Sequence, residues 1–300
     1  MADLPVVTMR RAQPWLGTLV EIAADGADRA CVEAGIEAAF AAIARVHVAL
    51  SGHEARSELV QLNRTAAQRP ERVSADLATV LALALDVAAR SEGVFDPTIG
   101  GEVAAWGFLP RHGERAERAS WRDVRLFDGC VRFARPLVLD FDGIAKGYAV
   151  DCAVAALAGA GVANACVNAG GDLRTLGPRG ETVFVRTGGA QSVVMPLLRL
   201  QDAAVATSAY SGQRRSVGGR YATPLIDPRS RLPVMSTRTV SVVAPTCMLA
   251  DALTKVVALR GMRAAGVLAA YGASATMLSV VRGRWRCTRL PRVEANRRAA

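Results

Sequence analysis

The chain has 300 residues, of which 51% are hydrophobic, so it can bury a substantial core as one large domain or two ordinary ones. Its net charge of +10 raises the question of a polyanionic partner, but seven arginines and a single acid fall in residues 281–300, which is typical of a solvated, mobile basic tail at about 282–300. Because the positive charge gathers in this tail, we expect no specific nucleic-acid partner. No run of about 18 apolar residues and no secretory signal is visible, so we expect a cytoplasmic protein with no transmembrane segment.

Apolar periodicity predicts a first strand over 15–24 and a long helix over 27–50. A second helix is expected over 74–91. A loop over 93–101 follows, and the polar residues 102–123 are typical of an exposed excursion rather than of a linker.

The second half of the chain groups short strands between helices. Asp128-Gly129 predicts a hairpin, a strand is expected over 136–141, and a helix over 144–158. The remaining predicted elements are strands near 165–169, 182–186, 192–195, 203–208, 238–243 and 275–281, and helices over 246–259 and 263–271. Because strands come in runs rather than in regular βα alternation, and no linker is visible, we predict one α+β domain spanning 1–300.

The cysteines and histidines argue against a zinc site and a disulfide framework, because no CxxC pair and no paired histidines occur. We expect reduced, mostly buried thiols at Cys31, Cys130, Cys152, Cys166, Cys247 and Cys287.

The lysines are a sharper signal. Of 37 basic residues only Lys146 and Lys255 are lysine. A compact ammonium suits places where a planar guanidinium does not fit, so both positions are candidates for a defined role.

The segment LVLDFDGIAKGYAVD (137–151) places Asp140 and Asp142 two residues apart near a strand end, with Gly143 and Lys146 at the start of the following helix. Such a junction suits phosphate oxygens or a metal. The alternative is structural, with the aspartates capping the helix and pairing with the lysine. Spacing alone leaves both interpretations open.

In VNAGGD, Gly170 and Gly171 permit a close backbone approach to a ligand, with Asn168 and Asp172 facing a cleft, or they form a tight turn between strands. In GVFDPTIG, the rigid loop could present Phe95 as a wall for a flat ring, or it could simply anchor the loop.

Asp251 and Lys255 share one helix face four residues apart, and this spacing alone favours a surface ion pair.

Taken in order, eight segments resemble the ApbE family of FAD:protein FMN transferases: LGTLVEI, SELVQLNR, GVFDPTIG, LDFDGIAKGYAVD, VNAGGD, VATSAYS, LIDPRSRLPV and APTCMLADALTK. The resemblance implies a single domain of mixed, largely antiparallel sheet with long helices. It also implies cleavage of FAD, transfer of FMN through a phosphoester to a Ser or Thr of an acceptor protein, release of AMP, and a magnesium ion. The implied FAD contacts are Leu16, His53, Val94, Phe95, Asp96, Asp140, Lys146, Asn168, Gly170, Gly171, Asp172 and Leu225.

The resemblance further implies that Gly143 (through its carbonyl) and Asp251 bind the magnesium, because a hard cation prefers oxygen ligands. The candidate catalytic residues are Lys146, Asp251, Lys255 and Asp142, and Asp172 is a second candidate general base.

Four positions depart from the family pattern. Lys255 stands where the family has Thr or Ser, and an ammonium cannot ligate a metal but could take the cation's place or lie beside the phosphates. Pro224 stands where the family has His before IIDP, His53 replaces an aromatic, and Leu16 replaces Met. A magnesium-dependent FAD pyrophosphatase and a non-catalytic FAD-binding protein are therefore the alternative functions. The acceptor is expected to be a cytosolic protein or the cytosolic face of a membrane protein, and a monomer and a homodimer are both open.

Overall fold

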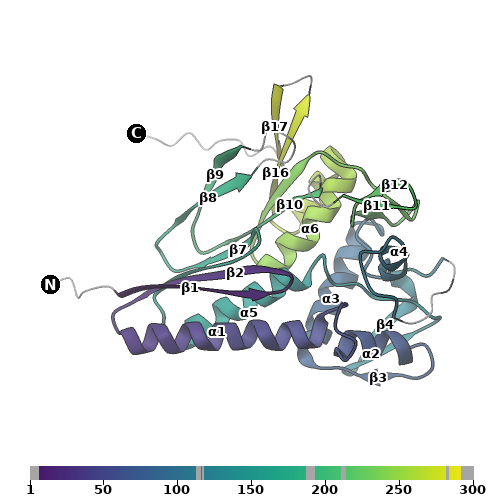
Figure 1. Cartoon of the computed structure of the whole chain (residues 1–300), viewed down its shortest axis with the longest axis horizontal. Helices are drawn as coiled ribbons and strands as arrows, with labels where there is room; N and C mark the ends of the chain where they lie inside the picture. Colours follow the sequence, from purple (N-terminus) through teal and green to yellow (C-terminus); the bar gives the residue numbers. More distant parts are fainter. Residues whose placement is uncertain are drawn as a thin grey trace.

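The largest element of the fold is an eight-stranded sheet in which every neighbouring pair of strands is antiparallel (Figure 1). The computed structural model describes residues 7–112, 116, 118–186, 193–210, 214–281 and 284–291. In sheet order the strands are β1 (Val7–Trp15), β2 (Thr18–Gly26), β6 (Asn164–Ala169), β7 (Asp172–Leu176), β10 (Ala204–Ala209), β15 (Thr239–Ala244), β16 (Ser274–Val281) and β17 (Arg284–Leu290).

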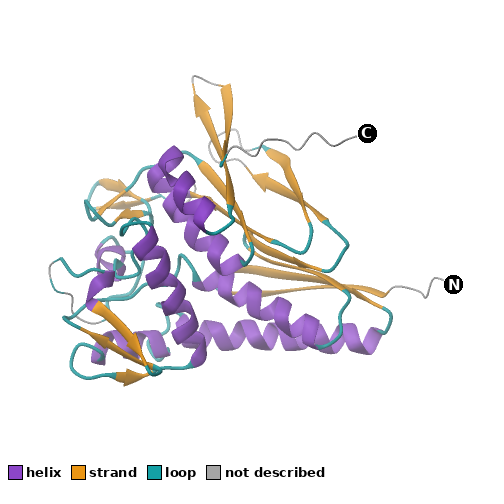
Figure 2. Ribbon diagram, turned by 180° about the vertical axis from the view of Figure 1, so that it is seen from behind, coloured by secondary structure: helices purple, strands orange, loops and turns teal. Residues whose placement is uncertain are grey.

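Long helices lie together on one side of this sheet (Figure 2), where α1 packs against α5 and α5 against α6. Side-chain caps at Asp28, Ser57, Ser74 and Thr246 accept backbone N–H groups and fix where four of the helices begin. The helices are α1 (Arg29–Leu50), α2 (Glu58–Thr65), α3 (Ala75–Arg90), α4 (Gly100–Ala105), α5 (Ala145–Gly159), α6 (Cys247–Arg260) and α7 (Ala265–Ala270). None of those among the described residues is long and apolar enough to cross a bilayer.

The contact between α5 and α6 is unusually close. A Cβ at Gly147 would lie 2.3 Å from the carbonyl oxygen of Cys247, so only glycine allows this approach. One turn further along α5, the Asp151 carboxylate accepts the N–H groups of Cys247 and Met248, each at 2.9 Å, and Arg174 of β7 donates to it at 2.6 Å. These bonds fix the start of α6 against α5 and the sheet.

Smaller strand pairs surround the main sheet. They are β3 (Glu71–Arg72), β4 (Val124–Phe127) and β5 (Cys130–Phe133) in one sheet, and the pairs β8 (Glu181–Arg186) with β9 (Val194–Leu200), β11 (Arg215–Val217) with β12 (Arg220–Ala222), and β13 (Ile226–Asp227) with β14 (Leu232–Pro233). One hydrophobic cluster runs from the main sheet through the helices to the β3-β5-β4 sheet, and it includes Ile22, Val150 and Phe133. The α+β architecture with largely antiparallel pairing is therefore confirmed.

The N-terminal strand was predicted incompletely, because β1 pairs with β2 as a hairpin that begins at Val7. β1 was missed since it is a polar edge strand that contains Pro14, whereas its partner is apolar. Leu16 and Gly17 turn the hairpin with φ of 57° and 70°. Such angles suit a type I′ turn, and they are strained for a leucine.

The predicted strand over 136–141 is wrong. The segment does not pair with a neighbouring strand among the described residues, and its β-pairing there consists of one isolated parallel bridge between Ile99 and Val138. A side chain replaces the missing partner strand, because the Asn63 amide donates to the carbonyl of Leu139 at 3.0 Å and accepts its N–H at 2.8 Å.

Three further predictions need correction. Residues 284–290 of the predicted mobile tail form β17, and 292–300 lie outside the described residues. The excursion over 102–123 is not simply exposed, because Glu102, Val103 and Leu109 are buried against Ile226 and neighbouring residues. All six thiols are free, but only that of Cys247 is buried.

Replacing Asn63 by alanine should destabilise the protein strongly, because two buried backbone groups of Leu139 lose their partners. We expect a loss of about 2–4 kcal/mol in the free energy of unfolding, measured by urea denaturation. The exposed Gln68, just beyond the same helix, is the matched control, and Gln68→Ala should change stability by less than about 0.5 kcal/mol. Equal effects of the two substitutions would contradict the role of Asn63.

Candidate functional site

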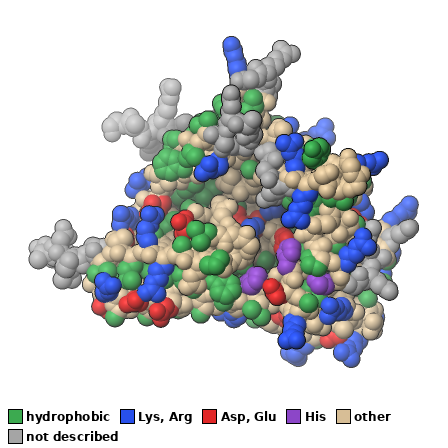
Figure 3. Space-filling view, viewed as in Figure 1, with side chains coloured by type: hydrophobic (Ala, Val, Ile, Leu, Met, Phe, Trp, Pro, Cys, Tyr) green, Lys and Arg blue, Asp and Glu red, His purple; other side chains and the backbone are tan. Residues whose placement is uncertain are grey.

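A cleft of about 1740 Å³ opens beside the main sheet. Its walls come from the β1–β2 and β6–β7 turns, β8, β10, the start of α5 and the loops around 94–99 and 224–228. Figure 3 shows the hollow on this face, with histidine and basic side chains near its rim. The volume exceeds the roughly 300–1,000 Å³ of a typical small-molecule site, so it suits an extended ligand of dinucleotide size.

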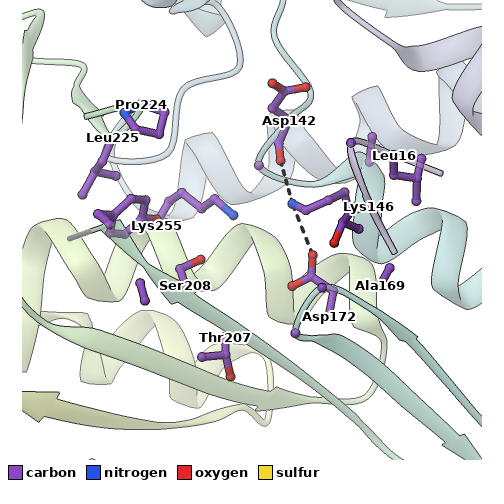
Figure 4. A pocket seen from close by; sticks show the side chains of 18 of the residues that line it. Leu16, Asp142, Lys146, Ala169, Asp172, Thr207, Ser208, Pro224, Leu225 and Lys255 are labelled. Carbon is purple, nitrogen blue, oxygen red and sulfur yellow. Dashed lines mark hydrogen bonds and ion pairs between the residues drawn. The ribbon is translucent and has the colours of Figure 1, made fainter. Parts of the chain in front are cut away.

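Lys146 in the first turn of α5 lies among oxygen atoms of three aspartates. Its ammonium donates to the main-chain carbonyl of Asp142 at 3.2 Å and lies 3.3 Å from Asp172 Oδ2 (Figure 4). The Asp251 carboxylate of α6 is 3.8 Å away. The α5–α6 contact thus brings the charges of two helices and of strand β7 to one point.

Asp251 and Lys255 form a buried ion pair, so the predicted surface pair is wrong. The side chain of Asp251 is only 1% exposed, and Lys255 Nζ donates both to its carboxylate and to its carbonyl oxygen, the latter at 3.2 Å. Thr254 links the same turn to β10 through the Ser208 hydroxyl at 2.9 Å. Spacing on a helix does not reveal burial, which here follows from the packing of α6 against β10 and α5.

The two lysines and two carboxylates of this cluster shift one another's pKa values. Burial acts to raise the pKa of Asp251, but Lys146 and Lys255 outweigh it and keep that pKa below its usual value. Burial acts to lower the pKa of Lys146, but Asp172 and Asp251 raise it overall. Burial and the charge of Asp251 raise the pKa of Asp172 to about 6. At neutral pH the cluster therefore holds two ammonium groups and two carboxylates.

The glycine pair between β6 and β7 turns the backbone toward the cleft. Gly170 and Gly171 have φ of 65° and 105°, and the N–H of Gly171 donates to Asn168 Oδ1 at 3.0 Å. A Cβ on Gly170 would lie 2.5 Å from Thr18 Oγ1. The glycines are thus required by the turn itself, and the same turn presents Asp172 to Lys146.

Apolar residues line another part of the cleft: Leu16, Val94, Phe95 and Leu225. Asp96 also borders the cleft, but its carboxylate serves the loop, accepting Thr98 N–H at 2.9 Å, the Thr98 hydroxyl at 2.7 Å and Trp121 N–H at 3.4 Å. Its side chain is thus a loop anchor, and it holds Phe95 in position.

Asp140, Asp142 and His53 form a second acidic group beside the lysines. His53 Nε2 lies 3.5 Å from Asp142 Oδ2, and the hydrogen bond with Asp142 is the main reason that the pKa of His53 is raised. Asp140 Oδ1 accepts the N–H of Asp142 at 2.9 Å. Burial, with the charge of Asp142, raises the pKa of Asp140 to about 7.

Comparison with known families settles the relationship. The family model of the ApbE family matches residues 16–277. The chain belongs to the ApbE family. The resemblance read from the eight sequence segments is thereby confirmed.

Two relatives are named FAD:protein FMN transferase. That of Rhodobacter capsulatus is 32% identical over 263 residues, which cover 82% of this chain and 50% of the relative. That of Haemophilus influenzae is 30% identical over 255 residues, covering 77% of this chain and 73% of the relative. The matched region thus spans only half the length of the Rhodobacter protein.

Solved ApbE structures share the fold. The flavin transferase ApbE of Vibrio cholerae superimposes with a TM-score of 0.81 over 96% of this chain and 98% of its own, at 24% identity. The ApbE protein of Thermotoga maritima gives a TM-score of 0.79, covering 95% and 97%, also at 24% identity. At these identities the likeness establishes the architecture.

The cleft brings together the residues that the sequence nominated. Those along its wall are Leu16, His53, Val94, Phe95, Asp96, Asp140, Asp142, Gly143, Lys146, Asn168, Gly170, Gly171, Asp172, Leu225 and Lys255. Asp251 is the exception, since it lies beneath the wall and reaches the cleft only through the two lysines. The contacts of each residue with FAD remain predictions.

The ligands that the ApbE resemblance implies for magnesium do not fit a metal ion here. Asp251 binds Lys255 with Oδ1, and its Oδ2 accepts the Gly147 N–H at 3.4 Å and faces Lys146. A Cβ on Gly143 would lie 2.9 Å from Lys255 Cε, so the lysine stem packs where the metal would approach. Among the described residues no group of three or more His, Cys, Asp or Glu is placed to hold a metal. No step is therefore assigned to a metal ion.

Several cleft residues were missed because only motif positions were nominated. Tyr210 is 6% exposed, lines the cleft, and its hydroxyl has no hydrogen-bond partner among the described residues. Tyr210 and Ser208 both lie in VATSAYS, a segment that contributed to the family resemblance but from which no site residue was nominated. Arg214 and Arg215 also border the cleft, and Arg215 stacks over Phe108 at 5.2 Å.

The raised pKa of Asp140 predicts that removing its charge stabilises the folded protein in a pH-dependent way. Because its folded pKa of about 7 lies above the unfolded value of 3.8, its stabilising contribution is present below about pH 4 and is lost as pH rises through 7. Asparagine keeps the acceptor for the Asp142 N–H and cannot ionise. Asp140→Asn should therefore raise the free energy of unfolding at pH 8 relative to pH 4.5, on the order of 1 kcal/mol, in urea denaturation at both pH values.

Asp76 provides a control of opposite sign. Burial acts to raise its pKa, but hydrogen bonds from Arg45 and Tyr148 hold that pKa below its usual value. Its contribution is therefore complete above about pH 4 and is lost only as pH falls below that value, so Asp76→Asn should cost stability about equally at pH 8 and at pH 4.5. If Asp140→Asn had the same effect at both pH values, the assigned ionisation would be wrong.

Proposed function

We propose that this chain is an FAD:protein FMN transferase, which binds FAD in the cleft and transfers its FMN part to a Ser or Thr hydroxyl of an acceptor protein. The observation that carries this proposal is the pair Lys146 and Lys255 at the floor of a cleft that also has an apolar wall. A dinucleotide pyrophosphate needs positive charge, and a flavin ring needs apolar surface. The family relatives that bear this name support the same reading.

In this proposal the flavin lies along Leu16, Phe95 and Leu225, and the pyrophosphate lies over Lys146. α5 supports the phosphate end, since it begins at this point without a side-chain cap and directs the positive end of its dipole toward the cleft. Gly143 precedes the helix, and its missing side chain makes room for the stem of Lys255 beside the phosphate end.

The reaction exchanges a phosphoanhydride bond for a phosphoester bond. The acceptor oxygen attacks the FMN-side phosphorus, the bond from that phosphorus to the bridging oxygen breaks, and AMP leaves with the electron pair. FAD and the protein hydroxyl thus give protein-bound FMN, AMP and one proton. Lys146 and Lys255 stabilise the charge that develops on the phosphoryl and leaving oxygens.

Asp142 is the group best placed to take the proton. Its carboxylate is half exposed at the cleft, whereas Asp172 and Asp251 are buried and held by the lysines. His53 beside it can share the charge or pass the proton to solvent. Asp142 is therefore the proposed general base.

Two alternative functions follow from Pro224, which lines the cleft and offers no group that can transfer a proton. Water could replace the acceptor hydroxyl, which would make the protein an FAD pyrophosphatase. Alternatively the cleft could bind FAD without turnover. A cytosolic location of the acceptor remains a prediction from the sequence.

One incubation separates the three functions. The purified chain is mixed with FAD and with cytosolic and membrane fractions of the source cells, and flavin fluorescence is read in a denaturing gel beside AMP release. Transfer gives a fluorescent protein band and AMP in equal amount. AMP and free FMN without a band would identify a pyrophosphatase, and neither product would leave an FAD-binding protein.

The charge of Lys146 should be essential to turnover. Lys146→Met keeps the length of the stem and removes the ammonium, and we expect AMP release to fall by a factor of about 10² to 10³. The control is Arg69→Met, because Arg69 pairs with Glu71 on an exposed surface and does not line the cleft. A loss of less than about threefold in Lys146→Met would exclude a role for this lysine in the transition state.

A further inference from the structure

Lys146 and Lys255 reach the same space from opposite sides. In Figure 4 the two ammonium groups point toward each other across the cleft floor, one from α5 and the other from α6. Asp172 and Asp251 lie beneath them. The chain's two lysines therefore form a fixed pair of positive charges facing the cleft.

We propose that Lys255 is the built-in cation of this site, so that FAD binding and FMN transfer require no divalent metal. This inference rests on the proposed function, and it assigns the contacts with the pyrophosphate oxygens to two protein side chains.

The position of Lys255 supports the assignment. Its Nζ donates to the carboxylate and to the carbonyl oxygen of Asp251, the two atoms on that residue which a hard cation would otherwise use. From there the stem runs past Gly143, where a Cβ would lie 2.9 Å from Cε and 3.6 Å from Nζ. The ammonium thus binds Asp251 and its stem packs against Gly143, the two residues to which the ApbE resemblance assigns magnesium.

The charge balance of the cluster supports it independently. Asp172 and Asp251 supply two negative charges, and Lys146 and Lys255 supply two positive charges. A divalent ion next to Asp251 would meet an ammonium instead of a vacant carboxylate oxygen, and like charges at contact repel each other. The pyrophosphate brings two further negative charges, and the ammonium groups of both lysines still face the cleft where it would bind.

The choice of residue fits the same role. The other 35 basic residues of the chain are arginines, so lysine at these two places is not a matter of composition. The stem of Lys255 packs closely against Gly143, and a compact ammonium needs less room there than a planar guanidinium. An ammonium also has three N–H donors, so it can hold Asp251 and still donate to a phosphate.

During transfer Lys255 remains an ammonium and exchanges no proton. The acceptor oxygen forms its bond to the FMN-side phosphorus, AMP departs with the electrons of the broken bond, and the hydroxyl proton passes to Asp142. Lys255 and Lys146 stabilise the negative charge on the phosphoryl and bridging oxygens throughout.

The first test uses the wild-type chain without an acceptor. FAD fluorescence titrations in EDTA and in excess Mg²⁺ should give dissociation constants that agree within about twofold. Electron paramagnetic resonance of added Mn²⁺ should show no stoichiometric site. Tight Mn²⁺ binding that Asp251→Asn abolishes, or FAD binding that needs Mg²⁺, would overturn the proposal even if the chain had no transferase activity.

The second test compares two substitutions of the same lysine. Lys255→Thr introduces an oxygen that can ligate a metal, whereas Lys255→Met introduces none. Both should weaken FAD binding in EDTA by about tenfold or more, and Mg²⁺ should restore binding in Lys255→Thr alone, with a new Mn²⁺ signal. Unchanged FAD affinity of both variants in EDTA would overturn the proposal, and if neither variant folds the wild-type titrations still decide it.

The transfer reaction provides the third readout. Where the wild type transfers FMN, EDTA should leave the rate of AMP release within about twofold of that in Mg²⁺. A rate that EDTA abolishes and Mg²⁺ restores would refute the built-in cation while leaving the transferase function intact. If AMP is not released under either condition, the proposed function fails, and the FAD and Mn²⁺ titrations still judge the role of Lys255.

Discussion

The candidate site depends on the contact between α5 and α6. Gly147 lets the two helices approach until backbone meets backbone, and Asp151 fastens the start of α6 by accepting its first N–H groups. Lys146 lies in the first turn of α5, directly before this contact, and Asp251 lies one turn into α6. A small displacement of either helix would separate the charges that meet at the cleft floor, so one packing constraint sets the geometry of the chemistry.

The same constraint explains why the charges can be buried. Removing ions from water is costly, and an ion pair offsets that cost only when geometry supplies further hydrogen bonds. Here Asp251 accepts from Lys255 and from the Gly147 N–H, and Lys146 lies among oxygens of three aspartates. The cluster is therefore paired, yet its ammonium groups still face the cleft. Such an arrangement favours binding of a polyanion more than stability of the unliganded protein.

The sequence predicted the fold where local patterns decide it and failed where distant partners decide it. The helices over 27–50, 74–91, 144–158 and 246–259 follow from apolar periodicity and caps, and the structure agrees with them to within a few residues. The strand over 136–141 failed because the side chain of Asn63, 76 positions away in the sequence, takes the place of a neighbouring strand.

For the site, all the nominated residues except Asp251 line the cleft, because glycines, prolines and paired acids mark special backbone positions. The motifs could not predict that the Asp251–Lys255 pair is buried, since a spacing of four residues is the same on an exposed and on a covered helix face. Tyr210 was missed for a related reason: a lone tyrosine has no pattern, and only the three-dimensional structure shows that its hydroxyl has no hydrogen-bond partner among the described residues.

The distribution of charge also bears on how the site can work with Pro224 where the family has a histidine. Of the acids near the floor, Asp172 and Asp251 are bound by lysines, so neither can leave its partner to accept a proton without exposing an uncompensated charge. Asp142 binds Lys146 through its main-chain carbonyl, and its half-exposed carboxylate lies beside His53 at the edge of the cleft. The floor then supplies fixed positive charge and the edge supplies the proton acceptor. Because these two tasks fall on different residues, the absence of a histidine at Pro224 does not remove either of them.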